Sequence, residues 1–200
     1  MTASESDVDA AREALRQGGI VVYPTDTLYG LGCLADREHA VQRLLELTDR
    51  PPGKGVSAVF ASLDRARAWS VWTDTAEHLA RAFLPGPLTV VLAASPKAPR
   101  GIQAEQGTVA IRHVDRETTL RLAEVGPVVA TSANPAGETP PATIAEAREY
   151  FGDEVDAYVD AGRLEGPSST VVDAREAPGT VIREGPISED EIQEATTLGA

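Results

Sequence analysis

Four short, strand-like runs of this 200-residue chain each end in polar residues. They are VVYPTDT (21–27), VAIR (109–112), VVATSAN (128–134) and TVIR (180–183). Ligands of open α/β sheets bind outside the carboxyl ends of the strands, so we expect these four ends to converge on one site. Thr, Ser, Asn and Arg side chains bind phosphates and carboxylates through charge-assisted hydrogen bonds. The pattern therefore predicts a protein that binds anionic small molecules.

Strand-like and helical segments alternate along the chain, which predicts one α/β domain. Helical periodicity covers residues 7–17, 36–48, 63–69, 73–83, 117–124 and 144–151. Apolar or β-branched runs predict strands at residues 20–23, 56–60, 88–94, 108–112, 128–131, 157–159, 170–172 and 180–182. We expect a single-domain, twisted, mixed open sheet flanked by helices over residues 1–187. Residues 188–200 are expected to form an acidic C-terminal tail, either helical or loose.

The net charge of −13 limits the partners of this chain. Its basic residues are sixteen arginines and two lysines, Lys54 and Lys97. An acidic surface repels nucleic acid and anionic membranes, so anions must bind in a local pocket. Each arginine at a strand end is therefore a candidate ligand contact.

The N-terminus and the hydropathy pattern predict a cytoplasmic protein. No apolar run approaches the roughly 20 residues that a helix needs to cross a bilayer. The first residues, MTASESDVDAAREAL, are acidic and lack the basic start and the apolar stretch of a signal peptide.

The sequence has none of the usual signatures of covalent or metal catalysis. The lone Cys33 cannot form an internal disulfide or a thiolate zinc site, and its neighbours LYGLGCLA suggest a packed position. The histidines have no metal-ligand spacing; they are His39, His78 and His113. No Walker loop occurs and no GxGxxG follows a strand. Any nucleotide would therefore have to be bound by residues outside these two motifs.

Seven motifs run in order from VYPTDTLYGLG (22–32) to VIREG (181–185). Those between them are DRPPGK (49–54), LPGPLT (84–89), TVAIR (108–112), TSANPAG (131–137) and PSSTVVD (167–173). Together they resemble the YrdC/Sua5 family, from about residue 8 to residue 187. Members of that family are nucleotidyltransferases that make L-threonylcarbamoyl-adenylate and pyrophosphate from L-threonine, bicarbonate and ATP. The product serves the N6-threonylcarbamoyladenosine modification of tRNA, so the resemblance implies this function and a YrdC-like fold.

The resemblance implies a threonine pocket and a nucleotide pocket. The family's threonine contacts match Thr27, Arg112, Ser132 and Ser169. Its ATP contacts match Arg50, Lys54, Thr108, Asn134 and Arg183, with Ala142 lining the same loop. The implied catalytic residues are Arg50, Lys54, Ser132 and Asn134.

The chemistry of the family suits these residue types. Arg112 can form a bidentate pair with the amino-acid carboxylate. Arg50, Lys54 and Arg183 would neutralise charge that builds on the triphosphate as pyrophosphate leaves. No side-chain nucleophile is needed, because the threonine nitrogen takes up bicarbonate or carbon dioxide and the carbamate attacks the α-phosphorus of ATP. The resemblance also implies Mg²⁺ on the phosphates, with no carboxylate cluster to identify its ligands, and a threonylcarbamoyl-transfer complex as functional partner.

One departure from the family and one match bear on the activity. Where the family commonly has Lys-x-Arg, this chain has Thr48-Asp49-Arg50, which removes one positive charge that Lys54 could replace. A related subfamily lacks the Ser-x-Asn motif, which this chain has as Ser132-Ala133-Asn134. The second feature favours the synthase.

Plainer interpretations and other functions stay open at this point. Thr25 and Asp26 could simply form a turn after Pro24, and Arg112 and Arg183 could each pair with surface carboxylates. The alternative functions are an RNA-binding or ribosome-maturation module and a stand-alone carbamoyl-transfer domain. An RNA surface would need a basic stripe, and the acidic composition argues against direct tRNA binding.

Overall fold

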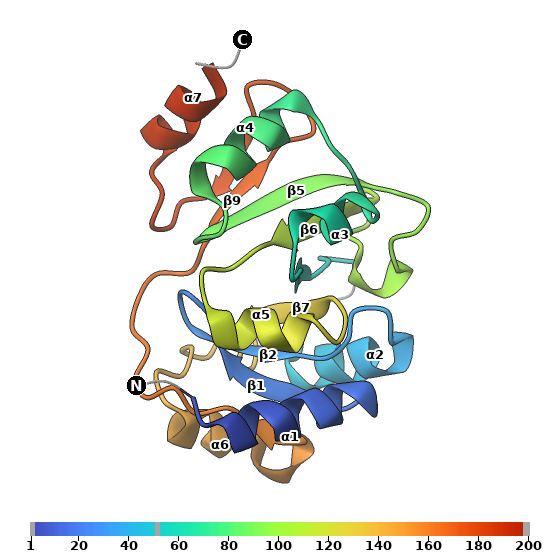
Figure 1. Cartoon of the computed structure of the whole chain (residues 1–200), viewed down its shortest axis with the longest axis vertical. Helices are drawn as coiled ribbons and strands as arrows, with labels where there is room; N and C mark the ends of the chain where they lie inside the picture. The colour runs from blue at the N-terminus through green and yellow to red at the C-terminus, as the bar shows by residue number, and fades with distance from the viewer. Residues whose placement is uncertain (1–2, 51–52, 198–200) are drawn as a thin grey trace.

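The computed structural model describes residues 3–50 and 53–197, which form one mixed α/β unit (Figure 1). Within these residues ten strands share one sheet in the order β10-β9-β5-β6-β3-β7-β2-β1-β8, and β4 pairs with β5. The strands are β1 (Val21–Pro24), β2 (Tyr29–Gly32), β3 (Ser57–Val59), β4 (Ser70–Val71), β5 (Leu88–Ala94), β6 (Thr108–Arg112), β7 (Val128–Ser132), β8 (Ala157–Tyr158), β9 (Thr170–Asp173) and β10 (Thr180–Arg183). This confirms the predicted single-domain, mixed sheet.

Helices flank the sheet on both faces. The α-helices are α1 (Glu5–Arg16), α2 (Glu38–Leu47), α3 (Leu63–Arg67), α4 (Asp74–Phe83), α5 (Glu117–Ala123), α6 (Ile144–Phe151) and α7 (Glu189–Thr197). Two short 3-10 turns are η1 (Arg100–Ile102) and η2 (Gly152–Glu154). None of the helices in the described ranges has the length and apolar character that a membrane crossing requires.

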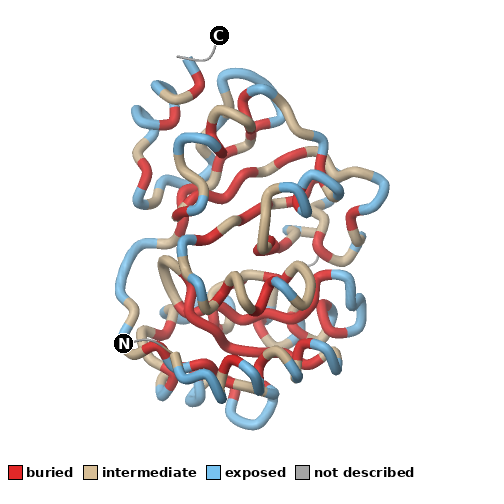
Figure 2. Tube along the Cα trace, in the orientation of Figure 1, coloured by how far each residue is buried: buried red, intermediate tan, exposed pale blue. Residues whose placement is uncertain are grey.

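Strand β1 shows how the alternation of side chains builds two cores. Val22 points into a cluster that contains the buried residues of α2 and α6. Its neighbours Val21 and Tyr23 point the other way, into a cluster with α1 and α5. A third cluster joins α4 and α7 to β5 and β9. The central strands are accordingly buried along most of their length (Figure 2).

Strand β2 was missed by the sequence analysis because glycines interrupt its apolar alternation. These glycines allow the strand to lie between β7 and β1 in the sheet interior. A Cβ atom on Gly32 would lie 2.2 Å from the carbonyl oxygen of Val129 and 2.7 Å from the Tyr23 ring. The Tyr23 hydroxyl in turn donates to the same Val129 carbonyl, at 2.8 Å. Glycine is therefore required by close packing of β2 on its neighbours.

The residues at the four strand ends meet at one site, as expected, although the strands do not all end at one edge of the sheet. β1 and β7 both run antiparallel to β2 and so point the same way. β6 points the opposite way, because it is parallel to β3, which pairs antiparallel with β7. β10 points the same way as β6, because both are antiparallel to the parallel pair β5 and β9. The polar residues nevertheless meet, on one face of the sheet.

Two element ends differ from the sequence analysis or add to it. Helix α2 begins at Glu38 with Arg37 as its N-cap, one residue after the expected N-cap Asp36, because the Arg37 N–H still closes a turn onto the Leu34 carbonyl. In the expected tail, helix α7 packs against α4 and buries Ile192. The proposed boundary at residue 187 stays a prediction.

We predict that Gly32→Ala lowers the free energy of unfolding by roughly 2–3 kcal/mol, because the added methyl group overpacks against backbone. Gly101→Ala is the matched control, since its new Cβ would meet only the Val41 side chain, at 3.5 Å from Cγ1 and 3.8 Å from Cβ, which are ordinary contacts. The control should change the free energy of unfolding by less than about 0.5 kcal/mol. Urea denaturation measures both, and equal stability of the two variants would contradict the packing argument.

Candidate active site

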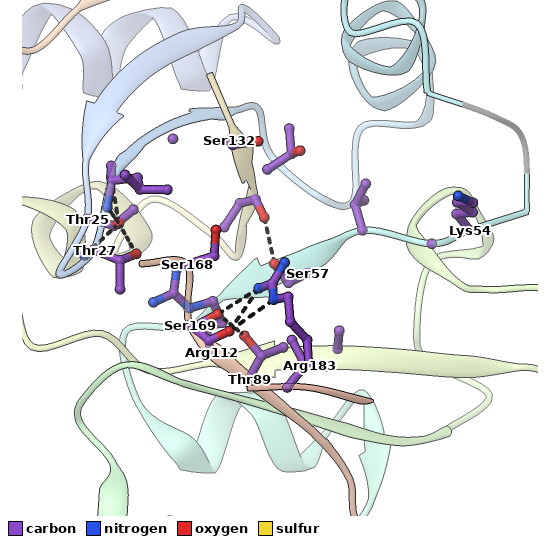
Figure 3. Close-up of a pocket in the computed structure, with 18 of the residues that line it drawn as sticks. Thr25, Thr27, Lys54, Ser57, Thr89, Arg112, Ser132, Ser168, Ser169 and Arg183 are labelled. Carbon is purple, nitrogen blue, oxygen red and sulfur yellow. Dashed lines mark hydrogen bonds between the residues drawn. The ribbon is translucent and has the colours of Figure 1, made fainter. Parts of the chain in front are cut away.

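A cavity of about 290 Å³ lies on one face of the sheet (Figure 3). Small residues at adjacent positions create it: Ser57 of β3 pairs with Ala110 of β6 on one side and with Ala130 of β7 on the other. Next to them, Gly30 of β2 pairs with Ser132. Large side chains at these positions would fill the space, so the cavity is a direct result of the strand register.

The cavity brings together most of the residues that the sequence analysis selected. Those lining it are Thr27, Arg50, Lys54, Arg112, Ser132, Ser169 and Arg183. Thr25, Ser57, Thr89 and Ser168 also line it and were missed as site residues. The signal for Thr89 was available, because it ends the LPGPLT motif, and that for Ser168 lies in PSSTVVD.

Three arginines make the cavity strongly cationic. Burial, and then the charge of Arg183, lower the pKa of Arg50. Burial, and then the charge of Arg112, lower the pKa of Arg183. The guanidinium groups therefore repel one another across a partly desolvated space. In a chain with a net charge of −13, such an arrangement favours binding of an anion.

Arg112 forms the one ion pair at this cavity among the described residues. Its Nη2 atom donates to Asp26 Oδ1 at 2.5 Å, and both side chains are only 7% exposed. Asp26 Oδ2 and Arg112 Nε are buried without a hydrogen-bond partner in the described residues. The expected surface pairing of Arg112 is thus replaced by a buried pair.

Arg183 reaches the cavity from the edge strand β10 and is held by Ser169, the residue just before β9. Its Nε and Nη2 atoms donate to the Ser169 carbonyl at 3.2 and 2.9 Å. The Ser169 hydroxyl shares a 2.8 Å hydrogen bond with the hydroxyl of Thr89 on β5. These contacts, drawn in Figure 3, fix one arginine and two hydroxyls with respect to each other.

Arg50 is directed into the cavity by the way α2 ends. Asp49 adopts a left-handed conformation with φ of 48°. The Arg50 N–H then bonds back to the Leu45 carbonyl, which closes the helix end. Arg50 Nε is buried and has no hydrogen-bond partner among the described residues, and the residue lines the cavity.

The turn after β1 presents Thr27. The Thr25 hydroxyl accepts from the N–H groups of Thr27 and Leu28, at 3.2 and 3.1 Å, and donates to the Leu28 carbonyl at 2.6 Å. This is the turn that the plainer interpretation expected. It also holds Asp26 against Arg112.

A second cavity of about 440 Å³ adjoins the first. The two share a wall that contains Lys54, Ser57 and Ala110. Thr108, Asp173 and Ile182 are among the residues that line the second cavity. Lys54 therefore stands between the two spaces, and a long ligand could occupy both.

Asn134 and Ala142, two predicted ATP contacts, line neither cavity. The Asn134 amide donates to the carbonyls of Pro135 and Glu138, at 2.9 and 2.8 Å, and its Oδ1 is buried without a partner in the described residues. The Ala142 N–H donates to Glu146 Oε2 at 2.7 Å, next to the start of α6. Their part in ligand binding stays a prediction.

The cysteine and the possible metal ligands of the described residues were compared with what nucleophilic or metal chemistry requires. Burial raises the pKa of the Cys33 thiol to about 12, so the thiol stays protonated at neutral pH. No group of three or more His, Cys, Asp or Glu side chains in the described ranges is arranged to hold a metal ion.

Fold and site together define a mixed α/β protein with an arginine-lined cavity for anions. The family model Sua5/YciO/YrdC, described as telomere recombination, matches residues 13–185. The chain belongs to this family.

Curated relatives carry the name threonylcarbamoyl-AMP synthase. That of Pyrococcus abyssi is 36% identical over 183 residues, which cover 90% of this chain and 54% of the relative. That of Halorhodospira halophila is 39% identical over 163 residues, which cover 78% and 83%. The chain thus spans about half the length of the archaeal relative and most of the bacterial one.

Solved structures agree with the fold. Pyrococcus abyssi Sua5 complexed with L-threonine has a TM-score of 0.90 and 35% identity, with 96% of this chain and 58% of that chain covered. Escherichia coli YciO has a TM-score of 0.83 and 27% identity, with 92% and 91% covered.

Thr48, which replaces the common lysine of the family, is fully buried at the end of α2. Its hydroxyl donates to the Leu44 carbonyl at 2.9 Å, and its own carbonyl accepts from the Ala136 N–H at 2.9 Å. Thr48 does not line either cavity. It therefore joins α2 to the loop after β7, and a side chain there does not face the arginines.

We predict that Thr48→Lys destabilises the protein by up to roughly 3–5 kcal/mol, the scale for an uncompensated buried charge. Thr48→Val keeps the volume and should cost about 1 kcal/mol, the contribution of the lost hydrogen bond. Thermal or urea unfolding measures this difference. A Thr48→Lys variant that is as stable as wild type and binds ATP more tightly would instead show that the ammonium group reaches the cavity.

Proposed function

We propose that the chain is an L-threonylcarbamoyl-adenylate synthase, a nucleotidyltransferase that uses L-threonine, bicarbonate and ATP. The observation that carries the proposal is the cavity itself, which combines several hydroxyl groups with an ion-paired arginine, Arg112, and with further cationic side chains that have no carboxylate partner among the described residues. Figure 3 shows Thr25 and Thr27 at one end and Lys54 at the other. The name of the curated relatives and the L-threonine complex of the archaeal neighbour support the same assignment.

At one end of the cavity, L-threonine would bind through its carboxylate and its hydroxyl group. Arg112 offers Nη1, which has no hydrogen bond within the described residues, to the carboxylate. Thr27, Ser132 and Ser169 would orient the amine and the side-chain hydroxyl. Held in this way, the amine takes up bicarbonate, loses water and becomes a carbamate. Its placement next to ATP supplies the effective concentration that the reaction needs.

ATP would bind at the opposite end and extend into the second cavity. Arg50 and Arg183 would contact the phosphates. Lys54, on the wall that the two cavities share, would contact the part of ATP that extends toward Thr108. A carbamate oxygen attacks the α-phosphorus and pyrophosphate leaves. The cations stabilise charge on the leaving group. Asn134 and Ala142 would join the nucleotide only if the loop that carries them moves, since neither lines a cavity.

Mg²⁺ would reach the site bound to ATP, with phosphate oxygens and water as most of its ligands. Asp26, the carboxylate next to the cavity, is already paired with Arg112. We therefore assign no step of the reaction to a protein-bound metal. The adenylate product would then pass to a threonylcarbamoyl-transfer complex that acts on tRNA. The RNA-binding and carbamoyl-transfer alternatives have no specific observation in their favour.

The first test of this function is the substrate dependence of ATP turnover. Formation of AMP-containing product and pyrophosphate should require L-threonine and bicarbonate together, because the carbamate is the nucleophile. Pyrophosphate release measured with labelled ATP, with each substrate omitted in turn, decides the matter. Equal release without threonine would exclude the synthase.

The second test separates the two ends of the cavity. Arg112→Ala should weaken threonine binding by roughly 2–4 kcal/mol, the scale for losing one partner of a desolvated charge pair, and should change ATP affinity much less. Lys54→Ala is the matched variant and should do the reverse. Calorimetric titration of each ligand, with circular dichroism to check folding, measures both. Unchanged threonine affinity in folded Arg112→Ala would reject the carboxylate assignment.

A further inference from the structure

Asp26 carries the one carboxylate paired with an arginine of the first cavity in the described residues. It does not line the cavity, whereas Arg112 does. Asp26 therefore contacts the guanidinium group without forming part of the cavity wall. Its side chain is as buried as that of Arg112, at 7% exposure, so solvent screens this pair little.

The backbone around Asp26 is fixed independently of the ion pair. Thr25 closes the turn through both its N–H and its hydroxyl, with the Leu28 carbonyl as the common acceptor. One residue earlier, the Pro24 carbonyl accepts from the Thr119 hydroxyl of α5. The Asp26 carboxylate on this turn therefore keeps its position and does not move with the Arg112 guanidinium group.

Arg112 needs such a fixed partner because its neighbours repel it. The charge of Arg112 contributes to the lowered pKa of Arg183, and the charge of Arg183 contributes to the lowered pKa of Arg50. The three guanidinium groups therefore form a row of like charges. The 2.5 Å contact to Asp26 holds Nη2. Nε is buried without a partner in the described residues, which leaves Nη1 as the donor for a ligand.

We propose that Asp26 is a positioning and specificity-determining residue, which orients Arg112 and reserves it for a carboxylate rather than a phosphate. This inference rests on the proposed function. A singly charged carboxylate on an amine-bearing ligand can share Arg112 with Asp26. A polyphosphate at the same place would set several negative charges against that buried carboxylate, and like charges in an interface cost several kcal/mol. Asp26 thus directs phosphates to Arg50 and Arg183.

The test is the ratio of the dissociation constant of inorganic pyrophosphate to that of L-threonine, measured by calorimetry without Mg²⁺. In Asp26→Asn, lost orientation weakens threonine and lost repulsion strengthens pyrophosphate, so the ratio should fall at least roughly tenfold, about 1.4 kcal/mol. A ratio within about threefold of wild type would overturn the proposal. A purely structural role of Asp26 would lower stability and leave this ratio unchanged.

Further variants show whether Asp26 acts through Arg112. In an Arg112→Ala background, Asp26→Asn should leave the dissociation constant of L-threonine unchanged, because the orientation that the substitution removes acts through Arg112; an undiminished weakening of threonine there would also overturn the proposal. Glu77→Gln removes the carboxylate of the Arg67 pair, whose two residues line neither cavity, and should leave the ratio at its wild-type value.

Failure of Asp26→Asn to fold and failure of the proposed function give different results. If Asp26→Asn does not fold, Asp26→Glu retains the charge and displaces Arg112 by one methylene group, and it should weaken threonine at least roughly threefold. Wild-type threonine affinity in that variant would then overturn the proposal. A wild-type protein that binds no threonine at all would contradict the proposed function itself, before any variant is compared.

Discussion

The contact between Gly32 and the backbone of Val129 is the constraint on which the rest of the structure depends. It places β2, and with it the β1–β2 hairpin, directly against β7. The turn of this hairpin carries Thr27 and Asp26, and the end of β7 carries Ser132. A wider spacing at this point would separate the two sides of the cavity. Close packing in the core and the geometry of the site therefore have the same cause.

The site itself opposes stability, since it brings three guanidinium groups together and pairs one of them. Repulsion and desolvation both act against the charged forms of Arg50 and Arg183. Such an arrangement is maintained by the surrounding hydrogen bonds, such as those from Arg183 to the Ser169 carbonyl. A ligand that supplies negative charge relieves the repulsion, so binding and stability are coupled.

Sequence patterns predicted regular elements well where periodicity is unbroken and less well elsewhere. The expected strands at 88–94 and 108–112 and the helix at 144–151 agree with β5, β6 and α6. Strand β2 was missed because its glycines serve packing, which only the neighbouring strands reveal. The polar residues were selected correctly as a group, although they meet on a face and not at an edge. The pairing of Asp26 with Arg112 links residues 86 positions apart, and no local pattern contains it.

The contrast between an acidic exterior and a cationic cavity affects how a nucleotide arrives. Far from the cavity, a polyanion meets the field of a body with a net charge of −13 and is repelled. At physiological ionic strength, charges more than about 8 Å away are largely screened, so the arginines dominate the field that a nucleotide meets once it is within that distance of them. Added salt should therefore remove more of the outer barrier than of the inner attraction. Association of the nucleotide would then become faster with moderate salt, the reverse of what a basic protein shows.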